Sequence, residues 1–206
     1  MNRRIEELSA SLAGVEHGFK EIERCAIADF ASRDARGVAE LARTAGESGT
    51  VQVRMYGAFL LGYLAAHDEH TLHILKDVVS CDEDWRVQEI LAKSFDRYCR
   101  DRGYAEALPT IDEWLSSGEP NVRRAVTEGL RTWTGRDYFR EHPEEAVRRL
   151  SALREDASEY VRKSVGNALR DISKKHPDLI VAELASWELD SKEARQVHKL
   201  ASRLLA

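Results

Sequence analysis

The sequence lacks the features that would mark an oxidised, membrane-bound or cysteine-ligated metal protein. Its three cysteines, Cys25, Cys81 and Cys99, are odd in number and widely spaced. They provide neither a disulfide framework nor a CxxC metal motif. No apolar run near the N-terminus is long enough for a signal peptide, and none elsewhere reaches membrane-spanning length. We therefore expect a cytoplasmic protein with reduced thiols and no membrane partner.

Familiar catalytic signatures are missing as well. The chain has no Walker phosphate loop, no GxSxG nucleophile elbow and no HExxH zinc-binding helix. His67, His70 and His73 form an HxxHxxH pattern, but the third histidine leaves the helical face of the first two. No cysteine or acid completes a set of four ligands around them. We predict surface histidines, no metal site and no cofactor.

Proline is scarce and strand-like alternation is absent, so helices can occupy most of the chain. There are four prolines in 206 residues. Apolar residues recur at spacings of three and four, the period of an amphipathic helix. In the segment 158–175 this stripe consists of Tyr160, Val161, Val165, Ala168, Leu169 and Ile172. The pattern predicts an all-α fold, with helices over 2–12, 19–30, 35–44, 52–66, 69–79, 85–100, 105–115, 122–133, 143–153, 160–174, 179–187 and 194–205.

One of these helices recurs along the chain. Each copy opens with an apolar residue followed by arginine, and a weaker copy ends the series; the arginines are Arg54, Arg86, Arg123, Arg162 and Arg195. They are separated by 32, 37, 39 and 33 residues. A period of this length made of helix pairs is typical of an α-solenoid of the HEAT or armadillo kind. We predict one domain over 1–206, with 1–33 as a cap and about five helix pairs over 34–206.

The repeated arginines and the tryptophans are expected to serve the fold. An arginine at the start of each second helix can bond carbonyls or acids of the preceding repeat. Tryptophans at 114, 133 and 187 are expected in the core or between repeats. Trp85 is the exception, because it stands at a helix N-terminus beside carboxylates.

Charge is unevenly distributed although the net charge is only −5. Residues 1–120 carry 14 Lys+Arg against 22 Asp+Glu, whereas residues 121–175 carry 13 against 9. In the later repeats the polar residues one, five and eight positions after the arginine share one helical face. This polar ladder consists of Arg124, Glu128, Arg131, Lys163, Asn167 and Arg170. Its cations could follow a phosphate backbone, and the alternative is a solvated helix face.

Three segments resemble the AlkD-type DNA alkylation repair proteins, which are HEAT-like-repeat DNA glycosylases. They are DWRVQE at 84–89, NVRRAVTEGLRTW at 121–133 and YVRKSVGNALRDISKKHP at 160–177. The resemblance covers most of the chain. It implies that duplex DNA lies in a basic concave groove and that cationic N3- or N7-alkylated purines are excised without entering a pocket. It also implies tryptophans against the deoxyribose and an aspartate that stabilises the developing oxocarbenium charge.

Carried over by position, the resemblance implies Trp85 and Glu89 as the catalytic residues. Trp85 matches the first tryptophan, and Glu89 occupies the aspartate position with one more methylene. Asn167 stands where the second tryptophan is expected, and Arg124 matches a phosphate-contacting arginine. Together with the polar ladder, the predicted DNA-binding residues are Arg124, Arg131, Lys163, Asn167 and Arg170.

Three functions remain open on these residues, with double-stranded DNA as the leading partner. One is a DNA glycosylase acting on alkylated purines, and a second is a non-catalytic binder of branched DNA. The third is a solenoid scaffold that holds a protein partner, favoured by the net charge of −8 over residues 1–120. Salt dependence separates them, because DNA binding weakens steeply as salt rises.

Overall fold

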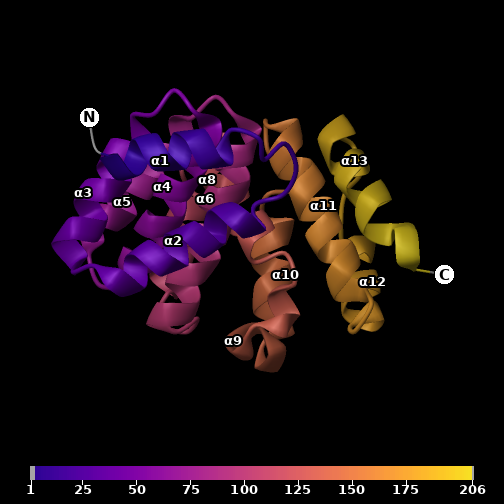
Figure 1. Cartoon of the computed structure of the whole chain (residues 1–206). Coiled ribbons are helices and arrows are strands. Elements are labelled where there is room, and N and C mark those ends of the chain that lie inside the picture. The colour runs from indigo at the N-terminus through magenta and orange to yellow at the C-terminus, as the bar shows by residue number, and fades with distance from the viewer. Residues whose placement is uncertain (1–2, 206) are drawn as a thin grey trace. The chain divides into compact units, whose positions relative to one another are not determined.

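The computed structural model describes residues 3–205, and within that range the chain is helical with no strand (Figure 1). Antiparallel helix pairs follow one another along the sequence, so the predicted all-α, solenoid class of fold is confirmed. The chain divides into two compact units, Met1–Arg102 and Gly103–Ala206. No described helix is long and apolar enough to cross a membrane.

The first unit is arranged around one buried helix. Its elements are α1 (Arg3–Leu12), α2 (Lys20–Ser32), α3 (Ala35–Gly46), α4 (Val51–Leu64), α5 (Glu69–Asp77), the 3₁₀ turn η1 (Val79–Cys81) and α6 (Trp85–Arg102). Helix α4 contacts α1, α2, α3, α5 and α6, and 12 of its 14 residues are buried. Its apolar residues lie on every side, which is the pattern of a helix enclosed by neighbours.

A buried carboxylate joins three of these helices. Asp29 on α2 is 6% exposed, and it accepts hydrogen bonds from the Tyr56 hydroxyl of α4 at 2.8 Å and from Arg4 Nε of α1 at 2.9 Å. Burial and the bond to Asp29 raise the pKa of Tyr56. The network satisfies polar groups that would be costly to bury alone, and it ties the N-terminal helices to α4.

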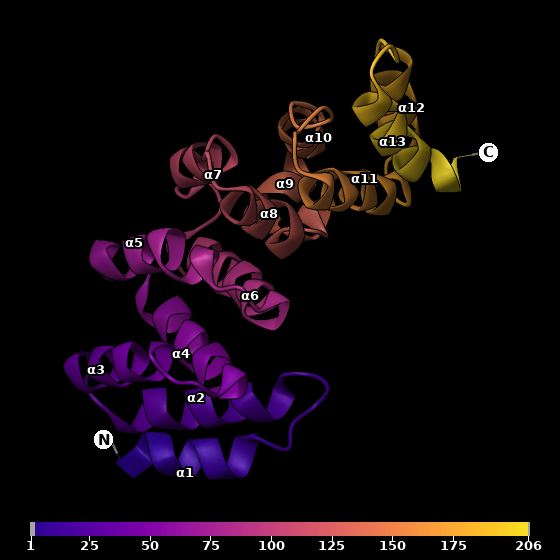
Figure 2. The ribbon, with the colours of Figure 1, turned by 90° about the horizontal axis from the view of Figure 1, so that it is seen from above.

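The second unit places α11 between two neighbours (Figure 2). Its elements are α7 (Leu108–Leu115), α8 (Pro120–Gly129), η2 (Trp133–Gly135), α9 (Asp137–Glu141), α10 (Pro143–Ser151), α11 (Glu159–Ser173), α12 (Pro177–Ala185), α13 (Lys192–Ala201) and η3 (Ser202–Leu204). Helix α11 contacts α8 on one side and α13 on the other. Pro143 and Pro177 open α10 and α12, where a missing N–H costs little.

Most predicted helices are present, with one clear difference. The helix expected over 122–133 ends at Gly129, and the chain continues through η2 and the short α9. Five residues of α9 are too few to show a helical period. The start expected at residue 2 lies outside the described residues.

The repeated arginine has a structural role, as predicted, but its acidic partner is not where we expected it. Arg123 donates to the carbonyls of Ser117 and Gly118 in its own repeat, and to Asp156 of the following repeat at 2.6 and 2.8 Å. Arg54 bonds Asp82 in the same way. In these two copies the acid comes from the following repeat, because the loop before the next second helix is within reach. Arg86 instead pairs with Asp84 of its own repeat at 2.7 Å, and Arg162 bonds the amide of Gln196.

Candidate nucleic-acid interface

The predicted site residues are divided between the two units. Trp85 and Glu89 lie on α6 of the first unit, whereas the five predicted DNA-binding residues lie on α8 and α11 of the second, or just after them.

Trp85 and Glu89 share one face of α6. Trp85 is the first residue of the helix and is 67% exposed, in contrast to Trp114, Trp133 and Trp187, which are buried as predicted. Glu89 is half-buried one turn further along, and side chains four apart on a helix lie one above the other. The helix start is held by Asp84, whose pKa is lowered by its hydrogen bond from Arg86. An aromatic ring therefore lies next to a carboxylate on the surface.

The polar ladder does bring Arg131 and Arg170 together, around a carboxylate that the sequence analysis did not consider. Asp171 accepts from Arg131 Nε at 3.1 Å, from Lys174 Nζ at 2.7 Å and from Arg170 Nη2 at 3.3 Å. Burial opposes ionisation of Asp171, but the hydrogen bonds from Lys174 and Arg131 outweigh it and lower its pKa. Arg131 also bonds Glu128 at 3.1 Å. Much of this positive charge is thus already balanced.

Hydroxyl groups hold the same two helices in register beneath the ladder. Thr127 Oγ1 of α8 and Ser164 Oγ of α11 are 2.9 Å apart, and Ser164 Oγ donates to Glu128 Oε2 at 2.9 Å. Thr127 and Ser164 are buried, so this contact fixes the spacing from which Arg124 and Arg131 extend.

Arg124 lies beside an aromatic ring that was placed in the apolar stripe. Its guanidinium carbon is 5.8 Å from the centroid of the Tyr160 ring. Tyr160 is 67% exposed, so its assignment to the buried stripe is wrong. Tyr160 lies at the edge of the stripe: Val161 next to it is fully buried, whereas the Tyr160 ring lies beside Arg124 of α8 and is open to solvent. The exposed ring and the half-buried arginine thus form an aromatic–cation pair.

Lys163 and Asn167 line an open pocket between α11 and α13. The pocket has a volume of about 380 Å³, and its remaining lining residues are Gln196, Lys199, Leu200 and Arg203. We call it the α11–α13 pocket. It holds three cations and no lining carboxylate, although Lys163 Nζ also lies 2.8 Å from the exposed Glu159.

The α13 side of this pocket was missed by the sequence analysis. Lys199 and Arg203 belong to the weakest copy of the repeat, which was not carried into the polar ladder. Gly166 allows the close packing that brings them near α11, since a Cβ on it would lie 2.6 Å from Leu200 Cβ. The signal available in the sequence was the pair of cations four residues apart on one helical face.

No group of three or more His, Cys, Asp or Glu side chains within residues 3–205 is arranged to hold a metal ion.

Comparison with known proteins gives a consistent result. The family model described as DNA alkylation repair enzyme matches residues 17–203. The crystal structure of AlkD2 from Streptococcus mutans is 54% identical with a TM-score of 0.97, covering 98% of this chain and 97% of that one.

Two more distant proteins were also found. The structure of the Pseudomonas fluorescens alkylpurine DNA glycosylase AlkC, bound to DNA containing an abasic site analog, is 23% identical with a TM-score of 0.53 and shows a similar fold; it covers 90% of this chain and 61% of that one. The uncharacterized protein YhaZ of Bacillus subtilis is 30% identical over 130 residues, which is 61% of this chain. This match spans only 34% of the length of YhaZ.

Proposed function

Because the chain belongs to the DNA alkylation repair enzyme family, we propose that it binds duplex DNA through the phosphate backbone, with the α11–α13 pocket as the main contact. The observation that carries the proposal is the grouping of Lys163, Lys199 and Arg203 in one pocket without a lining carboxylate. In a chain of net charge −5, such a grouping gives a local positive field that a phosphate can enter.

The amides of the pocket suit the same ligand. Asn167 offers two N–H donors for a phosphate oxygen. Gln196 is held in place, because its Oε1 accepts a hydrogen bond from Arg162 Nε at 2.8 Å and its Nε2 donates to Glu159 Oε1 at 3.5 Å. Contacts of this kind position a protein on DNA without reading the base sequence. We therefore expect binding that depends on salt and little on sequence.

The other predicted residues would extend this surface along α8 and α11. Tyr160 offers an exposed ring beside the half-buried Arg124, and stacking against a base or sugar is a common use of such pairs. Arg131 and Arg170 contribute less, since Asp171 and Glu128 already compensate them.

Charge reversal in the pocket tests the proposal. Lys199→Glu with Arg203→Glu is expected to weaken binding of a fluorescein-labelled duplex at least tenfold, measured by anisotropy at low salt. The matched control is Lys175→Glu with Lys192→Glu, which makes the same charge change at exposed positions outside the pocket. Equal loss in both double variants would show that only net charge matters and would reject the pocket.

Base excision is the second candidate, favoured by the exposed Trp85 with Glu89 one turn away. A cationic alkylated purine is a good leaving group, so a carboxylate that stabilises positive charge on the sugar can suffice for catalysis. In this proposal the negative carboxylate of Glu89 stabilises the positive charge on the sugar, and Trp85 packs against the deoxyribose. The longer reach of glutamate, and Asn167 in place of an aromatic residue, make the expected rate low.

Release of 7-methylguanine from a methylated duplex tests this candidate. We expect Glu89→Gln to abolish release while leaving DNA affinity within about twofold, because the amide keeps the shape of the side chain and loses its charge. Release that continues unchanged in the variant would exclude Glu89 as the catalytic group. Binding without any release by the wild type would favour a non-catalytic binder, and stronger binding of branched than of linear duplexes would identify its preferred DNA.

A further inference from the structure

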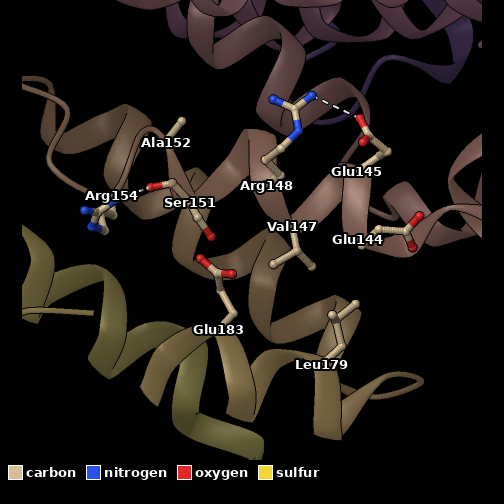
Figure 3. Close-up of a pocket in the computed structure, with 9 residues that line it drawn as sticks. All are labelled: Glu144, Glu145, Val147, Arg148, Ser151, Ala152, Arg154, Leu179 and Glu183. Carbon is tan, nitrogen blue, oxygen red and sulfur yellow. Dashed lines mark hydrogen bonds and ion pairs between the residues drawn. The ribbon is translucent and has the colours of Figure 1, made fainter. Parts of the chain in front are cut away.

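A second pocket of the second unit contains none of the residues assigned above. It lies between α10 and α12 and has a volume of about 470 Å³. Val147 and Ser151 line it from α10, and Leu179 and Glu183 line it from α12 (Figure 3). We call it the α10–α12 pocket. It is large enough for a small organic molecule.

The pocket contains a buried hydroxyl group that has no partner. Ser151 is 5% exposed, and its Oγ makes no hydrogen bond. Figure 3 shows this oxygen pointing toward the carboxylate of Glu183 across the pocket. Buried polar groups in folded proteins are nearly always paired. The lone hydroxyl therefore indicates a site that a ligand completes.

Glu183 provides an acceptor with spare capacity opposite this hydroxyl. One of its oxygens, Oε1, accepts a hydrogen bond from Trp187 Nε1 at 2.9 Å. Among residues 3–205, Glu183 makes no ion pair. A carboxylate can accept about four hydrogen bonds, so a donor in the pocket would find both the hydroxyl and the carboxylate available.

The remaining lining indicates the charge and shape of that donor. Arg148 is held by Glu145 at 3.0 Å, and Arg154 donates to the Ser151 carbonyl at 3.1 Å. The carboxyl end of α10 coincides with Ser151, where the helix dipole favours a positive group. Val147 and Leu179 form an apolar wall beside it. These features fit a cation with an aliphatic body.

We propose that the α10–α12 pocket binds a small aliphatic ammonium compound. Its ammonium group donates to Ser151 Oγ and to the Glu183 carboxylate, while an alkyl chain of about five carbons covers Val147 and Leu179. A single positive charge fits best, because Arg154 lines the same end of the pocket. The site is separate from the α11–α13 pocket in its residues, so it does not depend on DNA binding.

Titration of the full-length protein with n-pentylammonium chloride tests the proposal. We expect saturable binding by calorimetry and a melting temperature that rises with ligand concentration, because a ligand of the folded state stabilises it by mass action. 1-Pentanol and sodium pentanoate carry the same chain without the positive charge, and neither should bind measurably. Equal stabilisation by 1-pentanol would show that the pocket binds the alkyl chain alone and does not recognise the ammonium group, and it would overturn the proposal.

Two variants and a control assign the binding groups. Glu183→Gln should weaken binding at least tenfold, whereas Glu155→Gln, an exposed change outside the pocket, should leave it unchanged. Ser151→Ala should weaken binding several-fold, yet leave the ligand-free melting temperature unchanged or higher, since it removes an unpaired hydroxyl. A lower ligand-free melting temperature would mean that the hydroxyl already has a partner, and unchanged affinity in Glu183→Gln would also reject the site.

Discussion

At the scale of single residues, the ion pair between Arg123 and Asp156 is more enclosed than those of Arg54 with Asp82 and of Arg86 with Asp84. Its side chains are 13% and 4% exposed, and the two groups form a bidentate contact. The hydrogen bond to Asp156 raises the pKa of Arg123, which stays charged whether or not its partner is present. Removing the acid would therefore leave a partly buried cation.

We expect Asp156→Ala to lower the free energy of unfolding by about 3 kcal/mol, the usual cost of breaking a buried pair on one side. Urea unfolding at neutral pH measures it. Glu47→Ala is the control, because Arg43 and Glu47 pair with side chains 64% and 67% exposed, and such pairs contribute less than about 1 kcal/mol. Similar losses in both variants would contradict a special role for the enclosed pair.

Asp171 gives the protein a dependence on acid whose sign follows from its contacts. Its folded pKa lies below the unfolded value, since the bonds from Lys174 and Arg131 outweigh burial. The stabilisation is therefore complete above the unfolded pKa of about 4 and is lost as the pH falls through the folded pKa.

Asp171→Asn is expected to destabilise by about 1–2 kcal/mol at pH 7, from the loss of charge-assisted hydrogen bonds. The difference from wild type should shrink as the pH is lowered toward 3, where the native aspartate also becomes protonated. Urea unfolding at several pH values checks this, with the exposed Glu188→Gln as control. A difference that stays constant with pH would show that the carboxylate charge is not what matters.

At the scale of helices, α4 and α6 approach most closely at Gly62. A Cβ on this glycine would lie 2.7 Å from Ser94 Cβ and 2.9 Å from Ser94 Cα, so backbone as well as side chain would have to move. Ser94 also donates from Oγ to the Ala58 carbonyl at 2.9 Å, which fixes it in place. Such crowding costs about 1–3 kcal/mol in a packed interior.

Gly62→Ala should therefore destabilise by about 2 kcal/mol, and adding Ser94→Gly should recover part of the loss by removing the clashing Cβ. A double-mutant cycle in urea unfolding measures this coupling. Gly46→Ala, at the end of α3 with open space around it, is expected to be neutral. Additive losses at positions 62 and 94 would contradict the close approach.

Helical period was enough to predict most of the helices, but not where neighbouring helices meet. Ala92 and Ala168, each six residues after a repeated arginine, are buried. The tightest helix–helix contacts lie instead at Gly62 and Gly166. Which small residue faces a neighbouring helix depends on the crossing angle of the two helices and on the rotation of each about its axis. The hydrophobic pattern of the sequence does not determine these angles.

At the scale of the whole molecule, charge patterning located part of the candidate interface. It identified Lys163 and Asn167, which line the α11–α13 pocket. It missed Lys199 and Arg203, since α13 and the following η3 carry few repeat signals. It also gave no sign that Asp171 and Glu128 would compensate Arg131 and Arg170, because these acids meet the arginines partly across two helices. Formal charges along a sequence therefore overstate the field of the ladder.

This compensation leads to a prediction about the salt dependence of DNA binding. Each phosphate contact contributes a slope of about 0.9 log units of affinity per decade of salt. Replacing Lys199 and Arg203 by alanine should reduce the slope by the contribution of about two phosphate contacts. Replacing Arg131 and Arg170 by alanine should lower it less, because Asp171 and Glu128 already engage these guanidinium groups and leave them fewer phosphate contacts to lose.

Anisotropy titrations of a short duplex across a range of salt concentrations, with wild type and the two double variants, measure these slopes. A smaller slope only in the Lys199 and Arg203 pair would assign the main contact to the α11–α13 pocket. A larger decrease for the Arg131 and Arg170 pair would instead assign it to the polar ladder, and would mean that DNA displaces Asp171 and Glu128 from their arginines. Slopes that match the wild type in both variants would reject backbone binding by either surface, and absence of wild-type binding at low salt would favour a protein partner.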